Sequence, residues 1–172
     1  MVVVGDIYRR VRQYFSGHIH HFQNKFIFSR DWESDFFCVS NSGYCIEVEV
    51  KMSKSDFIAD FKKEKHELFR KHLLGEATTR CLPNKFWFAA PKGALRILDI
   101  PKYAGLIEIE WREGESEPRM DITIRAPFIH KNKMDIKHVL FGKYYYGHIS
   151  LQRENWELKR ALKKLTELKE KV

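Results

Sequence analysis

Two acidic residues and a lysine in the first third of the chain have the types and spacing for metal-dependent hydrolysis. Asp35 precedes a turn-like Ser-Asn-Ser-Gly segment at 40–43. Glu49 and Lys51 follow that segment on a stretch in which apolar and charged residues alternate. Carboxylate oxygens suit Mg²⁺ or Mn²⁺, and such a metal can bind a phosphate oxygen and acidify water. A lysine beside it can position that water or stabilise the charge that develops on the phosphate, so the set predicts phosphodiester hydrolysis.

The turn decides whether the two acids meet. If strands at 35–39 and 44–51 pair symmetrically about Ser42, Asp35 faces Glu49 at the ~5 Å spacing of cross-strand neighbours. Lys51 then lies two residues further along the same face. A register shifted by one residue would place the acids on opposite faces. The alternative is an ordinary solvent-facing strand, because Glu-x-Lys alone is a weak motif.

Hydrophobic periodicity predicts the elements that must position these residues. A first helix is expected over 5–16, and one continuous helix from Ser53 or Ser55 to the residues before Gly75. The stretch at 18–28 is mixed and is assigned no element. Further elements are expected as strands at 85–90, 106–111 and 120–125, a short helical piece at 95–98, and a terminal helix at 153–172. This order predicts an α/β protein with one domain over 1–172, a core at about 5–125 and a C-terminal extension at 126–172.

Composition limits the class of protein and its partners. The chain has 172 residues with 44% hydrophobic residues, which excludes wholesale disorder, and its net charge of +8 favours polyanionic partners. No apolar run approaches the ~18 residues that cross a bilayer, and the first residues do not form a signal peptide. The three cysteines form no CxxC pair. We expect a cytoplasmic protein, encoded by a cell or by a virus, without a membrane partner.

Basic residues next to the acids predict contacts with phosphate groups. Lys54, Lys62 and Lys63 lie at or after the start of the helix that follows the motif. A solvated helix face is the alternative, because acids are interleaved with them. The His-Lys-Asn-Lys segment at 130–133 could also touch phosphates, with an ordinary basic loop as the alternative. The leucines of 153–172 fit either a homodimer contact or packing within the chain.

These residues in this order resemble the PD-(D/E)XK nuclease superfamily, and within it the MmcB-like group of DNA-repair nucleases. The hairpin with Asp35 and Glu49-Val50-Lys51, set between two helices, carries the likeness. The matching blocks are 30–35, 47–62, 84–91 and 100–107, within about 6–125. The resemblance implies a restriction-endonuclease-like αβββαβ core with a mixed central sheet flanked by helices, and Mg²⁺-dependent cleavage of nucleic acid.

The resemblance also implies roles for individual residues. Asp35, Glu49 and the backbone carbonyl of Val50 would hold Mg²⁺ or Mn²⁺, and Lys51 would be the catalytic lysine. Many members carry a further acid, usually Glu, on the first helix. Here that helix offers only Asp6, so Glu33 or Glu47 is expected to take the supporting part.

We therefore expect a nuclease that hydrolyses DNA in repair, recombination or phage DNA processing, with RNA as an alternative substrate. Two other classes stay open. A non-catalytic nucleic-acid-binding module could retain the same fold, and it would bind DNA in a salt-sensitive way without metal or cleavage. A protein-interaction domain would use the leucine stripe of the terminal helix and would bind no DNA.

Overall fold

The structure, a computed structural model, describes residues 1–18, 20–25, 33–76, 82–134, 156, 159 and 160. The chain divides into two compact units, Met1–Met134 and Asp135–Val172. In the second unit, Trp156, Lys159 and Arg160 are helical, and the rest of the helix expected at 153–172 lies outside the described residues. Within the described part, no helix is long and apolar enough to cross a membrane.

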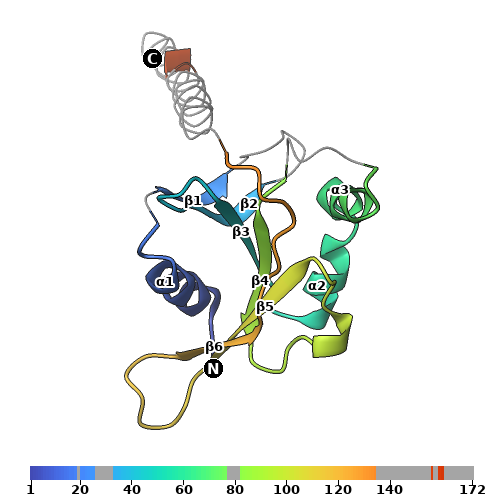
Figure 1. Cartoon of the computed structure of the whole chain (residues 1–172). Helices are drawn as coiled ribbons and strands as arrows, with labels where there is room; N and C mark the ends of the chain where they lie inside the picture. The colour runs from blue at the N-terminus through green and yellow to red at the C-terminus, as the bar shows by residue number, and fades with distance from the viewer. Residues whose placement is uncertain (19, 26–32, 77–81, 135–155, 157–158, 161–172) are drawn as a thin grey trace, which may run out of the picture. The chain divides into compact units, whose positions relative to one another are not determined.

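The first unit contains one mixed sheet with helices on both faces (Figure 1). Its six strands lie in the order β1-β2-β3-β4-β5-β6; β3–β4 and β4–β5 are parallel, and the other pairs are antiparallel. The predicted α/β class with a mixed central sheet is confirmed. The elements are α1 (Val4–Tyr14), β1 (His20–Lys25), β2 (Ser34–Val39), β3 (Cys45–Val50), α2 (Lys54–Asp60), α3 (Glu64–Leu73), β4 (Lys85–Pro91), the 3-10 turn η1 (Ile97–Asp99), β5 (Ala104–Glu110) and β6 (Arg119–Ile124).

The hairpin of β2 and β3 has the register that the sequence predicts. Phe37 pairs with Glu47, and Val39 pairs with Cys45. The same register, continued along β2, brings Asp35 opposite Glu49. Gly43 lies in the turn with a φ of 84°, a left-handed conformation that glycine adopts without steric cost.

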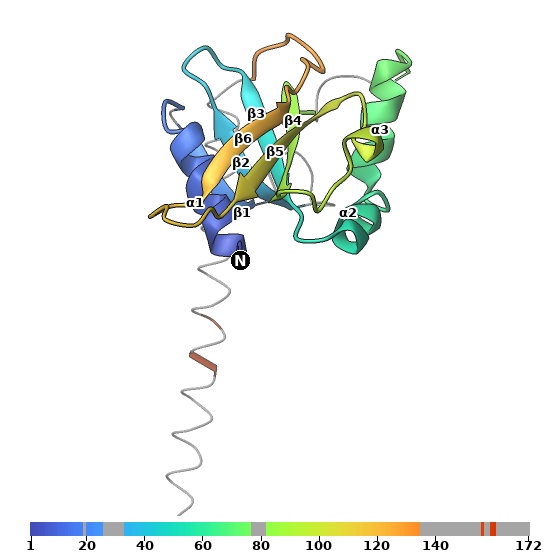
Figure 2. The ribbon, with the colours of Figure 1, turned by 90° about the horizontal axis from the view of Figure 1, so that it is seen from below.

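Two apolar cores lie on the two faces of the sheet. On one face, α1 packs its buried residues Ile7, Val11 and Phe15 against a cluster that includes Val48 and Val50 of β3. On the opposite face, a second cluster joins buried residues of α2 and α3 to β4 and β5 (Figure 2), among them Phe57, Phe69, Phe86, Phe88 and Leu106. Every residue of β3 is therefore buried, including its charged ones.

The continuous helix expected from Ser53 to Leu74 is wrong, because the chain breaks it after Asp60. Ser53 does cap α2, since its side chain accepts a hydrogen bond from the Asp56 N–H. Lys63 then takes an extended conformation, with φ −73° and ψ 138°, as the N-cap of α3. The apolar periodicity continues across this break, so it gave no sign of two helices.

The mixed stretch at 18–28, which carries no periodic signal, contains β1. This strand pairs antiparallel with β2 over its whole length, from His20 opposite Val39 to Lys25 opposite Ser34. With β1 in place, the order α1-β1-β2-β3, then α2 and α3, then β4 contains the αβββαβ order.

Candidate active site

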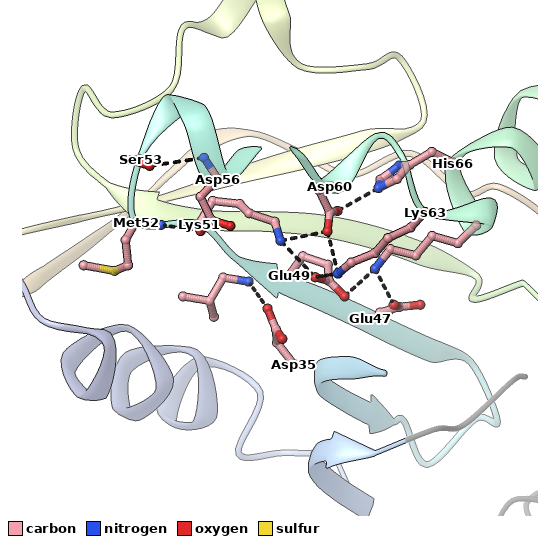
Figure 3. A network of polar contacts seen from close by, with 12 residues as sticks. Asp35, Glu47, Glu49, Lys51, Met52, Ser53, Asp56, Asp60, Lys63 and His66 are labelled. Atoms are coloured by element: carbon pink, nitrogen blue, oxygen red, sulfur yellow. Dashed lines mark hydrogen bonds and ion pairs between the residues drawn. The ribbon is translucent and has the colours of Figure 1, made fainter. Parts of the chain in front are cut away.

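The predicted site residues Asp35, Glu49 and Lys51 lie together where β2 begins and β3 ends (Figure 3). The Val50 N–H donates a hydrogen bond to Asp35 Oδ2 at 2.8 Å, which fixes this carboxylate beside the end of β3. The Lys51 ammonium lies 3.1 Å from Glu49 Oε2. The structure therefore joins all three predicted residues in one polar cluster.

Three lysine ammonium groups surround the buried carboxylate of Glu49. Lys51 and Lys63 both contact Oε2, at 3.1 and 3.2 Å, and Lys65 contacts Oε1. Lys65 also bridges to Glu47 Oε1 at 3.2 Å, and its side chain is fully buried. Lys63 is the most accessible of the three, with 39% of its side chain exposed. Because a buried ion must be paired to be tolerated, this arrangement keeps Glu49 ionised.

Asp60, the last residue of α2, is the second carboxylate that contacts Lys51. Its Oδ1 contacts Lys51 Nζ at 2.9 Å and Lys63 Nζ at 2.6 Å. Its Oδ2 contacts His66 Nε2 at 2.7 Å, and His66 Nδ1 lies 2.9 Å from the Tyr103 hydroxyl. This buried chain from Tyr103 to Lys51 fixes the lysine between two carboxylates.

Burial and charge give the facing acids different protonation behaviour. Burial, together with the charge of Glu49, raises the pKa of Asp35 to about 6. Burial opposes the charge on Glu49 as well, but Lys65, Lys63 and Lys51 lower the pKa of Glu49 below its usual value. No described lysine or arginine is hydrogen-bonded to Asp35. Of the two facing acids, Asp35 is therefore the one whose negative charge is less compensated, because Lys51 and Lys63 act on it only from a distance.

Burial also raises the pKa of Glu47 to about 7, although Lys65 is close to it. The Glu47 Oε2 atom is buried and has no hydrogen-bond partner among the described residues. Lys51 behaves differently, because Glu49 and Asp60 overcome burial and raise the pKa of its ammonium. Lys51 is thus a fixed cation at neutral pH, suited to stabilise negative charge rather than to accept a proton.

The oxygen atoms at the end of β3 fit a hard divalent cation. Asp35 and Glu49 supply carboxylate oxygens, and Asp35 carries negative charge that no ammonium group neutralises by direct contact. Glu49 would have to share its oxygens with, or release, one of the lysines, and Lys63 is the accessible one. No group of three or more His, Cys, Asp or Glu side chains that could hold a metal occurs in the described part of the chain, so this site would use two side chains and the Val50 carbonyl.

The first helix presents a tyrosine to the acids instead of a further carboxylate. Asp6 is engaged elsewhere: its Oδ2 accepts hydrogen bonds from Val3 N–H at 3.1 Å and from Trp111 Nε1 at 3.0 Å. Burial, and then the charges of Asp35 and Glu49, raise the pKa of Tyr8 to about 12. Tyr8 is therefore a neutral hydroxyl group close to the acid pair.

Not all of the predicted residues join the cluster. Glu33 is exposed and makes no direct contact with it, whereas Glu47 is part of it through Lys65. Lys62 is exposed, and Lys54 forms an ion pair with Asp99 at 3.8 Å. Lys63 contacts two acids of the cluster, so its predicted contact with phosphate would require it to leave at least one of them.

The sequence did not predict that Asp60, Lys65 and His66 hold the charged groups of Glu47, Glu49 and Lys51 in place. A usable signal was present in β3, where Glu47, Glu49 and Lys51 share one face. A parallel strand is covered on both faces, so charges on that face require partners from the covering helix. The break after Asp60, which turns Lys65 and His66 of α3 toward β3, has no comparable signal.

Comparison with known proteins gives information on the fold alone. No family model matches the chain, and no curated protein matches it. Among solved structures, the chain is similar to the SPO1766 protein of unknown function from Silicibacter pomeroyi, with a TM-score of 0.56 and 14% sequence identity. The match covers 91% of this chain and 92% of that chain. At this identity the likeness shows a shared fold and carries no information on activity.

Proposed function

We propose that this protein is a metal-dependent nuclease that hydrolyses DNA phosphodiester bonds, of the PD-(D/E)XK type that its motifs resemble. The observation that carries the proposal is the meeting of Asp35, Glu49 and Lys51 at the end of β3, where burial and the charge of Glu49 raise the pKa of Asp35. Two neighbouring carboxylates at the end of a sheet repel each other and lower the stability of the fold, so a purely structural role would not explain them. DNA repair, recombination or phage DNA processing are the settings that the resemblance favours.

Each residue of the cluster has a part in this proposal. Asp35, Glu49 and the Val50 carbonyl hold Mg²⁺ or Mn²⁺, which when bound would draw charge from the phosphate and acidify water. Lys51 donates hydrogen bonds to the phosphate oxygen on which negative charge develops. Asp60 is a positioning residue, because it holds the Lys51 ammonium at 2.9 Å.

Cleavage of DNA by wild type and site variants tests the proposal. Single-stranded, linear double-stranded and supercoiled DNA, with RNA as a further substrate, are incubated with Mg²⁺ or Mn²⁺. We expect Asp35→Ala and Lys51→Ala each to lose ~10²-fold or more of the rate, and Lys71→Ala, a control at an exposed lysine of α3 that has no predicted part in the site, to keep it. Equal cleavage by wild type and both site variants would show that the activity belongs to a contaminant or to another site.

A second candidate, a nucleic-acid-binding module without catalysis, is favoured by a specific observation. Both oxygens of Glu49 already contact ammonium groups, and the acid of the first helix is engaged by Trp111. Salt-sensitive DNA binding in EDTA, with no cleavage in either metal, would support this candidate and overturn the first.

A further inference from the structure

We propose that a surface at the starting ends of β3 and β4 binds single-stranded nucleic acid, and we call it the Phe128 surface. It consists of two aromatic rings, Tyr44 and Phe128, with Lys85 and Lys133 beside them, and of the exposed Lys131 in the segment that carries Phe128 and Lys133. The rings meet edge to face with centroids 5.2 Å apart. Lys85 lies 4.5 Å from the Phe128 centroid, and Lys133 lies 5.9 Å from the Tyr44 centroid.

The chain holds this surface in a defined shape. The segment that carries Phe128, orange in Figure 1, is fastened by the fully buried Asn84, whose Nδ2 donates to the backbone carbonyls of His130 and Asn132 at 3.0 and 2.8 Å. The Ile129 N–H donates to the Asn84 carbonyl at 2.8 Å, and Met134 N–H to the Gly43 carbonyl at 2.9 Å. A surface built in this way loses little conformational entropy on binding.

The charge of the Phe128 surface is not neutralised. Segments 40–46, 82–86 and 125–134 form it, and they contain no Asp or Glu. Its three lysines make no ion pair with any described residue. Several surface cations elsewhere are paired with acids: Lys92 lies 3.0 Å from Glu110, and Arg119 lies 3.0 Å from Asp121. Unpaired lysines on one side of a protein attract a polyanion.

The aromatic rings point to an unpaired strand. Phe128 is 44% exposed, unusual for a side chain that could pack inside. Unpaired bases can stack on such a ring while nearby lysines follow the phosphates, whereas bases within a duplex are already stacked on each other. The surface lies about five residues of β3 before Glu49, or ~17 Å, so it is separate from the candidate active site.

Fluorescence anisotropy with a labelled thymidine oligonucleotide of about 12 residues, in EDTA, tests the inference on the full chain. The triple variant Lys85→Gln, Lys131→Gln, Lys133→Gln should lower the slope of log K against log salt by about two. The control triple variant Lys71→Gln, Lys92→Gln, Lys102→Gln removes the same charge elsewhere and should leave the slope nearly unchanged. Phe128→Leu, which keeps an apolar side chain, should weaken binding by about tenfold.

The inference is overturned if both triple variants weaken binding equally, because net charge alone would then explain it. It is also overturned if Phe128→Leu binds as wild type does, or if a hairpin whose stem pairs the same thymidine run with adenosines binds more tightly. Thermal melting confirms that each variant is folded. Because no step needs metal or cleavage, the surface can bind even if Asp35 and Lys51 prove to have no part in hydrolysis.

Discussion

Asp35 and Glu49 face each other, yet the residues around them stabilise the ionised form of Glu49 and not that of Asp35. Glu49 contacts three ammonium groups, whereas Asp35 accepts a hydrogen bond from the Val50 N–H and contacts no cation of the described residues. The folded protein thus disfavours the ionised form of Asp35. Functional sites often retain groups that lower the stability of the fold, and Asp35 is such a group here.

Asp35→Asn should therefore stabilise the protein at alkaline pH. The pKa of Asp35 is about 6 in the folded chain and 3.8 ordinarily, so its ionisation lowers stability as pH rises from about 4 to 6. Asparagine can still accept the hydrogen bond from Val50. We expect a gain of at most about 3 kcal/mol at pH 8, shrinking toward zero at pH 4, measured by urea unfolding at both pH values.

The control for this experiment is Asp121→Asn, which removes an exposed acid paired with Arg119. Such surface pairs contribute ~0–1 kcal/mol, so this variant should show no comparable gain at pH 8. If Asp35→Asn were equally stable relative to wild type at pH 4 and pH 8, the incompletely compensated charge proposed for Asp35 would be wrong.

At the scale of elements, β3 and α3 are joined by charge in a place where apolar contact is usual. The fully buried Lys65 of α3 bridges Glu47 and Glu49 of β3. Around this bridge, Phe69 and Phe86 supply apolar packing. The position of α3 over the sheet therefore depends on one ammonium group as well as on its aromatic contacts.

Lys65→Met should destabilise the fold by ~3–5 kcal/mol, because two buried carboxylates would lose their cation. The double variant Lys65→Met, Glu47→Gln should recover part of this loss, since one of the two buried charges is removed. Lys71→Met, an exposed position on the same helix, should change stability by about 0.5 kcal/mol or less. Urea unfolding gives all three values, and a Lys65→Met protein as stable as the control would contradict the assigned bridge.

The β2–β3 part of the candidate site could be predicted from sequence, because it depends on residues that are close together in the chain. A turn symmetrical about Ser42 predicts the register of β2 and β3, and hence the meeting of Asp35 and Glu49, whereas a one-residue shift would have placed the two acids on opposite faces. The break between α2 and α3 could not be predicted in this way, because it places Lys63 and Lys65 against acids far away in the sequence. β1 was missed because it has no alternating pattern of its own.

At the scale of the molecule, the net charge of +8 is unevenly distributed. Four acids and three lysines are gathered within the cluster around Glu49, while the Phe128 surface holds lysines and no acid. Both apolar cores belong to the first unit, Met1–Met134. The first unit therefore contains the core, the candidate active site and the Phe128 surface together.

A chain of residues 1–134 should consequently fold without the second unit. We expect a single cooperative thermal transition by circular dichroism, because the described residues of both cores all belong to this part. A non-cooperative transition, or binding of a dye that reports exposed apolar surface, would show that residues 135–172 are required for folding. Full-length protein measured in the same buffer is the reference.

The ion pairs between Lys65 and the two glutamates also limit which residues can be substituted at these positions during evolution. Glu47 and Lys65 stand 18 residues apart in sequence, yet neither tolerates the loss of the other without an unpaired buried charge. In homologous chains we expect these two positions to change together, as an ion pair or as a pair of neutral residues. Asp35 has no such partner among the described residues, so under the proposed function drift at that position would be limited by activity and not by stability.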